Sequence, residues 1–166
     1  MVECKNLDPT ALGLFLVAIV SLPLGIMNLI DIDGATGPTS PFFTVMGILA
    51  LFVAYFAYRA DSQFGFTVFA LVGAAVALTG IGMGTFENIS FGIVFILAII
   101  WSILAKTPKN LTLILVTTAL IFLIVGLMDL VDSDLTKILG IVALLNGIFA
   151  IYLAFALALE NKIPVV

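Results

Sequence analysis

The residues that usually carry enzyme chemistry are almost absent from this sequence. Histidine does not occur and Cys4 is the only cysteine, so the chain offers no imidazole base and no thiolate cluster for a metal. A serine–histidine–aspartate set, a zinc-protease motif and a glycine-rich phosphate loop are also missing from the sequence. The six basic residues form no patch of the kind that binds nucleic acid. We therefore predict that the protein is not an enzyme, with no catalytic residues, metal, cofactor or nucleic-acid partner.

A few uncharged polar residues lie inside long apolar runs, where they are candidates to contact a passing solute. Asn28, Thr67 and Asn146 are the candidates for this role. A threonine hydroxyl in a helix commonly donates back to a carbonyl of its own helix, so Thr67 also has a structural explanation. A buried asparagine needs partners from neighbouring helices or from water. Asn146 therefore fits either interhelical bonding or the lining of a pathway.

Asp129 is the one acid of the sequence that can lie within a membrane, because it ends a long apolar run. Loss of water favours the protonated form of a carboxyl group, which makes Asp129 a candidate proton carrier. The alternative is a solvated helix end, since Asp132 and Asp134 follow closely. The sequence leaves both explanations open.

The elements that must position these residues follow from the composition. The chain is 63% hydrophobic and 10% charged, whereas a soluble domain is about half apolar and about a quarter charged. The long apolar runs cover residues 11–30, 42–60, 65–84, 89–105, 110–129 and 136–158. Each is close to the roughly 20 residues that a spanning helix needs, and none alternates in polarity as barrel strands do. We predict an all-α membrane protein in which 1–166 form one domain of six transmembrane helices.

The orientation of the chain in the membrane follows from its basic residues. Five of the six lie in the two tails and in the second and fourth connections, which share one side of a six-helix protein. Because cytoplasmic loops are enriched in lysine and arginine, both termini are expected to be cytoplasmic. The inner side then carries a net charge of +1 and the outer side −5, in agreement with −4 for the whole chain.

The boundary between the third and fourth runs is the least clear, because residues 80–88 contain three glycines. Glu87 lies in this segment, and a carboxylate is costly at the middle of a bilayer. We expect Glu87 in a short outer loop.

Glycines recur on the third and sixth runs, including Gly73 on the third and Gly140 and Gly147 on the sixth. Small residues let helix backbones approach closely in lipid. Close-packed helix crossings are the expected result, with a pore lined by exposed backbone as the alternative.

Several short motifs resemble those of the acetate uptake transporter family, the succinate–acetate permease group. Residues 8–14 read D-P-T-A-L-G-L and are similar to the family signature N-P-A-P-L-G-L, with Asp8, Pro9, Leu12 and Gly13 as its counterparts. Residues 63–69, Q-F-G-F-T-V-F, are similar to its T-F-G-L-T-A-F, and 150–154 match its A-I-Y-L-A. Asn28 matches the asparagine of its L-H-N motif. The resemblance implies six helices in a ring-shaped homo-hexamer of the cell membrane, with one pathway per protomer.

The same comparison implies where the pathway is narrow. The family has an aromatic and leucine constriction, and the matching positions here are Val17, Val72 and Thr118. Polar residues of the family are replaced by apolar ones at Ala50, Ala57, Met27 and about Leu157. The expected pathway is therefore less polar than that of the family.

Three functions follow as hypotheses. The first is a transporter or channel for acetate or a similar small monocarboxylate, moved as the protonated acid or together with a proton, because a negative outer face repels anions. The second is a passive channel for a neutral solute such as urea, a short amide or ammonia. The third is a membrane component that transports nothing.

Overall fold

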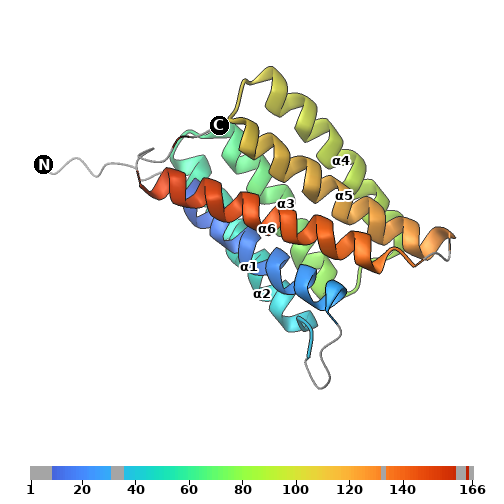
Figure 1. The fold of residues 1–166 in the computed structure, drawn as a ribbon. Coiled ribbons are helices and arrows are strands. Elements are labelled where there is room, and N and C mark those ends of the chain that lie inside the picture. Colours follow the sequence, from blue (N-terminus) through green and yellow to red (C-terminus); the bar gives the residue numbers. More distant parts are fainter. Residues whose placement is uncertain (1–8, 31–35, 132–133, 160–163, 165–166) are drawn as a thin grey trace, which may run out of the picture.

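The computed structural model describes residues 9–30, 36–131, 134–159 and 164. Six long α-helices form an all-helical bundle in this part of the chain (Figure 1). They are α1 (Thr10–Leu29), α2 (Ser40–Arg59), α3 (Gln63–Ile81), α4 (Thr85–Leu104), α5 (Lys109–Val131) and α6 (Thr136–Ala158). All six are long and apolar enough to cross a bilayer. The predicted fold class, six transmembrane helices, is confirmed.

The helix ends differ from the predicted spans by at most four residues. The largest difference is at α4, which begins at Thr85 rather than at residue 89 and places Glu87 in its first helical turn. The prediction that Glu87 lies in a loop is therefore wrong. An exposed carboxylate is favourable in the first turn of a helix, where backbone N–H groups are unpaired, so this acid does not end the helix.

The distribution of side-chain size shows that the bundle is built for lipid. Its inside is filled by small residues, among them Ala50, Ala54, Ala57, Ala143, Ala150 and Ala154. Its outside carries large apolar side chains, among them Phe52, Phe56, Leu97, Ile103 and Leu104. Water does not favour an outer surface of this kind, whereas hydrocarbon does. The chain is a multi-pass membrane protein.

The helices pack as three close antiparallel pairs, α1 with α6, α2 with α3 and α4 with α5. Glycines lie where each pair crosses. A Cβ atom built on Gly47 of α2 would lie 2.3 Å from the backbone nitrogen of Ala77 on α3. A Cβ on Gly25 of α1 would lie 2.7 Å from the backbone nitrogen of Leu144 on α6. The glycines therefore serve close helix packing, as their recurrence in the sequence predicts.

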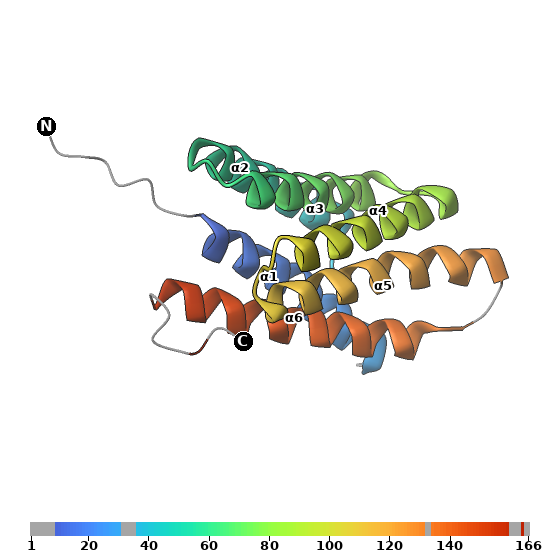
Figure 2. The same ribbon diagram turned by 90° about the horizontal axis from the view of Figure 1, so that it is seen from above.

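The pairs enclose a common interior. Seen from above, α1 lies between α2 and α6 (Figure 2), in agreement with its contacts to both helices. We call the end of the bundle where α1 begins and α6 ends the proximal end, and the opposite end the distal end. Described charged residues lie at these two ends, with Arg59, Lys106 and Lys109 at the proximal one.

The distal end is the acidic one. Glu87, Asp129 and Asp134 are exposed there, together with Lys137. Asp134 precedes α6, and hydrogen bonds from the side chain and the backbone N–H of Thr136 lower the pKa of its carboxyl group. This carboxylate thereby pairs one of the free N–H groups at the start of α6.

Candidate functional site

A cavity of about 120 Å³ lies inside the distal half of the bundle, and we call it the distal cavity. All six helices contribute to its wall. The lining residues are Val17, Val20, Ser21, Leu24, Phe43, Val72, Val76, Thr79, Asn88, Thr118, Ile121, Phe122, Val125 and Asn146. The wall is mainly aliphatic and aromatic, and none of these described residues is charged. A cavity of this kind suits a small solute without a formal charge.

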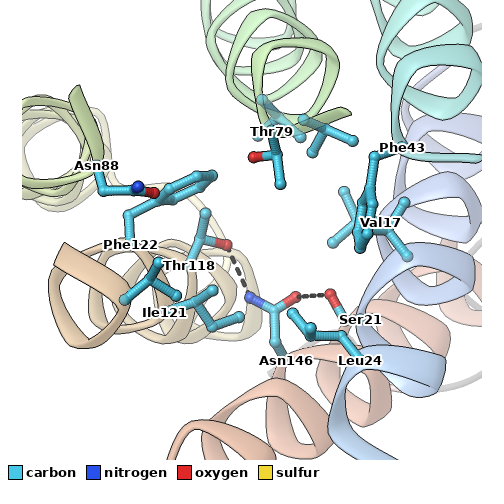
Figure 3. Close-up of a pocket in the computed structure, with 14 residues that line it drawn as sticks. Val17, Ser21, Leu24, Phe43, Thr79, Asn88, Thr118, Ile121, Phe122 and Asn146 are labelled. Carbon is cyan, nitrogen blue, oxygen red and sulfur yellow. Dashed lines mark hydrogen bonds between the residues drawn. The ribbon is translucent and has the colours of Figure 1, made fainter. Parts of the chain in front are cut away.

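Asn146 is the centre of the polar part of this wall (Figure 3). Its side chain is 1% exposed and joins three helices. The Nδ2 atom donates to the hydroxyl oxygens of Thr117 and Thr118 on α5, at 3.0 and 2.7 Å. It also lies 3.2 Å from the carbonyl oxygen of Ile114. The Oδ1 atom accepts from the hydroxyl of Ser21 on α1 at 3.2 Å.

The other hydrogen bonds of this network define which atoms donate. Thr117 donates its hydroxyl proton to the carbonyl oxygen of Leu113 or Ile114, at 2.9 and 3.0 Å, and Thr118 donates its own to that of Ile114 at 2.8 Å. Both hydroxyl oxygens can therefore only accept from Asn146, which places its NH₂ group toward α5 and its oxygen toward Ser21. The network is closed, since donors and acceptors satisfy one another.

Of the remaining polar groups of the distal cavity, the Thr79 hydroxyl donates its proton within the protein and the Asn88 amide donates one of its two. Thr79 donates to the carbonyl oxygen of Ala75 at 2.9 Å, and the Asn88 amide donates to that of Gly84 at 2.9 Å. Figure 3 shows the side chains of Thr79 and Asn88 across the cavity from Asn146. The hydroxyl groups of the wall thus offer lone pairs to a solute, because their protons are already donated.

A second cavity, of about 190 Å³, lies in the proximal half of the bundle, and we call it the proximal cavity. It is bounded by four of the helices that also bound the distal cavity, α1, α3, α5 and α6, and by the turns before α3 and α5. Its lining residues are Thr10, Ser62, Phe64, Gly65, Val68, Phe69, Pro108, Leu111, Leu153 and Leu157. Again none of these described residues is charged.

Four of the six residues expected on the pathway meet in one place. Val17, Val72, Thr118 and Asn146 all line the distal cavity, although they belong to four different helices. Asn146 both lines this cavity and bonds neighbouring helices.

Asn28 and Thr67 do not line either of these cavities. Asn28 donates to the carbonyl oxygen of Leu24 on its own helix at 2.7 Å, and Thr67 donates to that of Gln63 at 3.0 Å. Asn28 also packs against Gly140 of α6. Both side chains have the local structural role that a polar residue in an apolar helix commonly takes.

The remaining candidates lie at the helix ends. Asp129 is exposed in the last turn of α5 and accepts a hydrogen bond from the hydroxyl of Thr85 at 3.3 Å, so it has the position of the solvated helix end. Pro9 caps α1 and accepts from the N–H of Gly13 at 3.1 Å. Leu12 is exposed, and Asp8 lies outside the described residues.

Three polar residues of the distal cavity, Ser21, Thr79 and Asn88, are not among the residues expected on the pathway. Ser21 follows Val17 by four residues and therefore lies on the same face of α1, which is a signal that the sequence contains. Asn88 belongs to the segment expected to be a loop, and it reaches the cavity only because α4 begins at Thr85.

The described part of the chain thus forms six antiparallel spanning helices around an interior cavity with an uncharged lining. The chain has the fold of a protein described as the bacterial acetate channel SatP, with a TM-score of 0.80 and 18% sequence identity. The match covers 98% of this chain and 100% of the other. SatP is of the succinate–acetate permease family, so the resemblance seen in the sequence motifs extends to the whole fold. No protein-family model matches the sequence, and no curated protein sequence does.

Proposed function

We propose that the protein is not an enzyme but a channel or carrier for acetate or a similar small monocarboxylic acid. The acid passes through each protomer in its neutral form. The observation that carries the proposal is the distal cavity, which is uncharged and has its hydroxyl protons already donated. The shared fold with an acetate channel supports the choice of solute. The protomers are proposed to form a ring-shaped homo-hexamer in the plasma membrane, as the family resemblance implies.

The form of the acid follows from the cost of an ionised carboxylate in this cavity. A carboxylate that leaves water needs donors or a positive charge to replace its hydration. The lining offers no basic side chain and no free hydroxyl proton, and the one remaining amide N–H, on Asn88, does not replace the hydration of an anion. The O–H group of a carboxylic acid, by contrast, can donate to the free lone pairs of Ser21 and Thr79. The acidic distal end also favours the neutral acid over the carboxylate, because it repels anions.

Flux of acetate into proteoliposomes is expected to rise as the external pH falls toward the pKa of acetic acid. Above that pKa the neutral fraction increases about tenfold for each unit by which the pH falls. Because acetic acid also crosses lipid, the measured quantity is the flux above that of protein-free vesicles. Since the neutral acid carries no charge, the protein should produce no current in a planar bilayer. A protein-dependent flux that is unchanged between pH 7 and pH 5, or that carries anion current, contradicts the proposal.

A neutral amide such as urea is the second candidate, because the free lone pairs of the wall can also accept from N–H groups. Stopped-flow light scattering with acetate and urea on the same proteoliposomes separates the two. Faster protein-dependent flux of urea at every pH would favour the amide, and absence of flux for both would indicate a membrane component without transport activity.

We propose that both termini are cytoplasmic, because three of the four described basic residues, Arg59, Lys106 and Lys109, lie at the proximal end. Cys4 is the only cysteine of the chain, so it can report on the location of the N-terminus. A membrane-impermeant maleimide is expected to label it only after the cells are permeabilised. As a control, Glu87→Cys in a Cys4→Ser background should be labelled in intact cells, since Glu87 is exposed at the distal end. The reverse pattern would overturn the orientation.

A further inference from the structure

The two cavities lie in line within the same four helices, and a thin layer of the protein separates them. The distal cavity reaches Val17 on α1, Val72 on α3 and Thr118 on α5. One helical turn closer to the proximal end, the same helices carry Leu14, Phe69 and Leu115. We call these last three residues the seal layer. The proximal cavity begins there, because Phe69 is part of its lining.

The seal layer is buried and apolar. The exposed fractions of Leu14, Phe69 and Leu115 are 0%, 3% and 1%. All three belong to one contiguous cluster of buried apolar residues. The layer one turn toward the distal end is different, because Val17 and Val72 have small side chains and border open space. The exposed fractions of Val17, Val72 and Thr118 are 9%, 8% and 8%, so the seal layer is the more closely filled of the two layers.

Phe69 is the member of the seal layer with room to move. On one side its ring packs against α1 at Gly13, where a Cβ atom would lie 2.3 Å from the ring atom Cε1. The missing side chain of Gly13 provides the space that the ring occupies. On another side the ring borders the proximal cavity of about 190 Å³. Leu14 and Leu115 line neither of the two cavities.

We propose that Phe69, with Leu14 and Leu115, seals the path between the two cavities, and that the ring of Phe69 swings into the proximal cavity when a solute passes. This inference rests on the proposed transport function. It makes Phe69 the residue that sets the largest acid that can pass, because the opening is as wide as the space that the ring leaves. Gly13, a residue of the motif at the start of α1, leaves the space in which the Phe69 ring lies when the path is closed.

The test compares Phe69→Ala with Phe95→Ala in proteoliposomes, with acetic acid and the four-carbon butyric acid as solutes at one pH. Phe95 is a matched control, because it is 0% exposed and belongs to the same apolar cluster but lines neither cavity. In Phe69→Ala the protein-dependent flux of butyric acid relative to acetic acid should rise about tenfold, which is about 1.4 kcal/mol of activation free energy. In Phe95→Ala the ratio should remain within about twofold of that of the unmodified protein.

Two further variants keep the proposal falsifiable if Phe69→Ala does not fold. Phe69→Leu keeps an apolar side chain and should raise the ratio by a smaller factor, while Phe69→Trp should lower it. An equal ratio in the Phe69 variants and Phe95→Ala, in protein that melts as a single species, overturns the seal and leaves the proposed function intact. Absence of flux in the unmodified protein contradicts the proposed function itself.

Discussion

Replacing Gly47 by alanine is expected to lower the free energy of unfolding by about 3 kcal/mol, the upper part of the range for overpacked interiors. The added Cβ would lie 2.3 Å from the backbone nitrogen of Ala77 and 2.6 Å from its Cα. Backbone atoms cannot rotate away as a flexible side chain can. The two helices must therefore move apart along a contact that also includes Gly73 and Gly80 of α3.

The measurement is thermal or SDS-induced unfolding of the purified protein in detergent, with Gly84→Ala as the matched control. A Cβ on Gly84 meets only the carboxylate end of the Glu87 side chain, at 2.5 Å. That side chain is exposed and can turn away, so the control should unfold within about 0.5 kcal/mol of the unmodified protein. Equal stability of the two variants would mean that the α2–α3 contact adjusts without loss.

The fold could be predicted because lipid imposes few and strong requirements. A spanning helix must satisfy its own backbone and be about 20 residues long, so the apolar runs mark the helices almost directly. The error at α4 has a physical cause. The sequence-based prediction takes Glu87 as the mark of a loop. A helix can, however, extend beyond the bilayer core and carry an acid in its first turn. Runs of apolar residues locate helices better than single charges locate their ends.

The candidate site could be predicted only in part, because a sequence shows which residues are polar but not the direction in which they point. Thr67 precedes Val72 by five residues, which places it about 140° away around α3. Asn28 lies two turns beyond Ser21, on nearly the same face of α1, yet the crossing with Gly140 of α6 occupies that position. The first result follows from helical geometry. The second depends on how α1 and α6 pack, which no local pattern contains.

The sequence also does not show which layer of side chains closes the path, for a related reason. Matching of family positions indicates Val17, Val72 and Thr118, and the structure places these three around the distal cavity. Whether a layer is open or closed depends on the combined volume of side chains from several helices. Val17 and Val72 border the distal cavity, whereas Leu14 and Leu115 of the next layer line neither cavity.

Replacing Asn146 by leucine is expected to destabilise the bundle by about 2 kcal/mol, because three interhelical side-chain hydrogen bonds are lost at about 0.6 kcal/mol each. Those bonds link Asn146 of α6 to Ser21 of α1 and to Thr117 and Thr118 of α5. Leucine fills a similar volume, so the loss reports the hydrogen bonds rather than a cavity. The measurement is unfolding in detergent together with protein-dependent flux of acetic acid.

Asn28→Leu is the matched control for Asn146→Leu, because within the described part of the chain the Asn28 amide donates to its own helix, at Leu24. It should change the unfolding free energy by less than about 0.5 kcal/mol and leave the flux unchanged. In Asn146→Leu the hydroxyl of Ser21 is released into the distal cavity as a free donor. A donor can hydrogen-bond a carboxylate, so the preference for the neutral acid over the anion should weaken in this variant alone. If the two leucine variants unfold alike and keep the same pH dependence of flux, Asn146 neither holds the three helices together nor sets the polarity of the pathway.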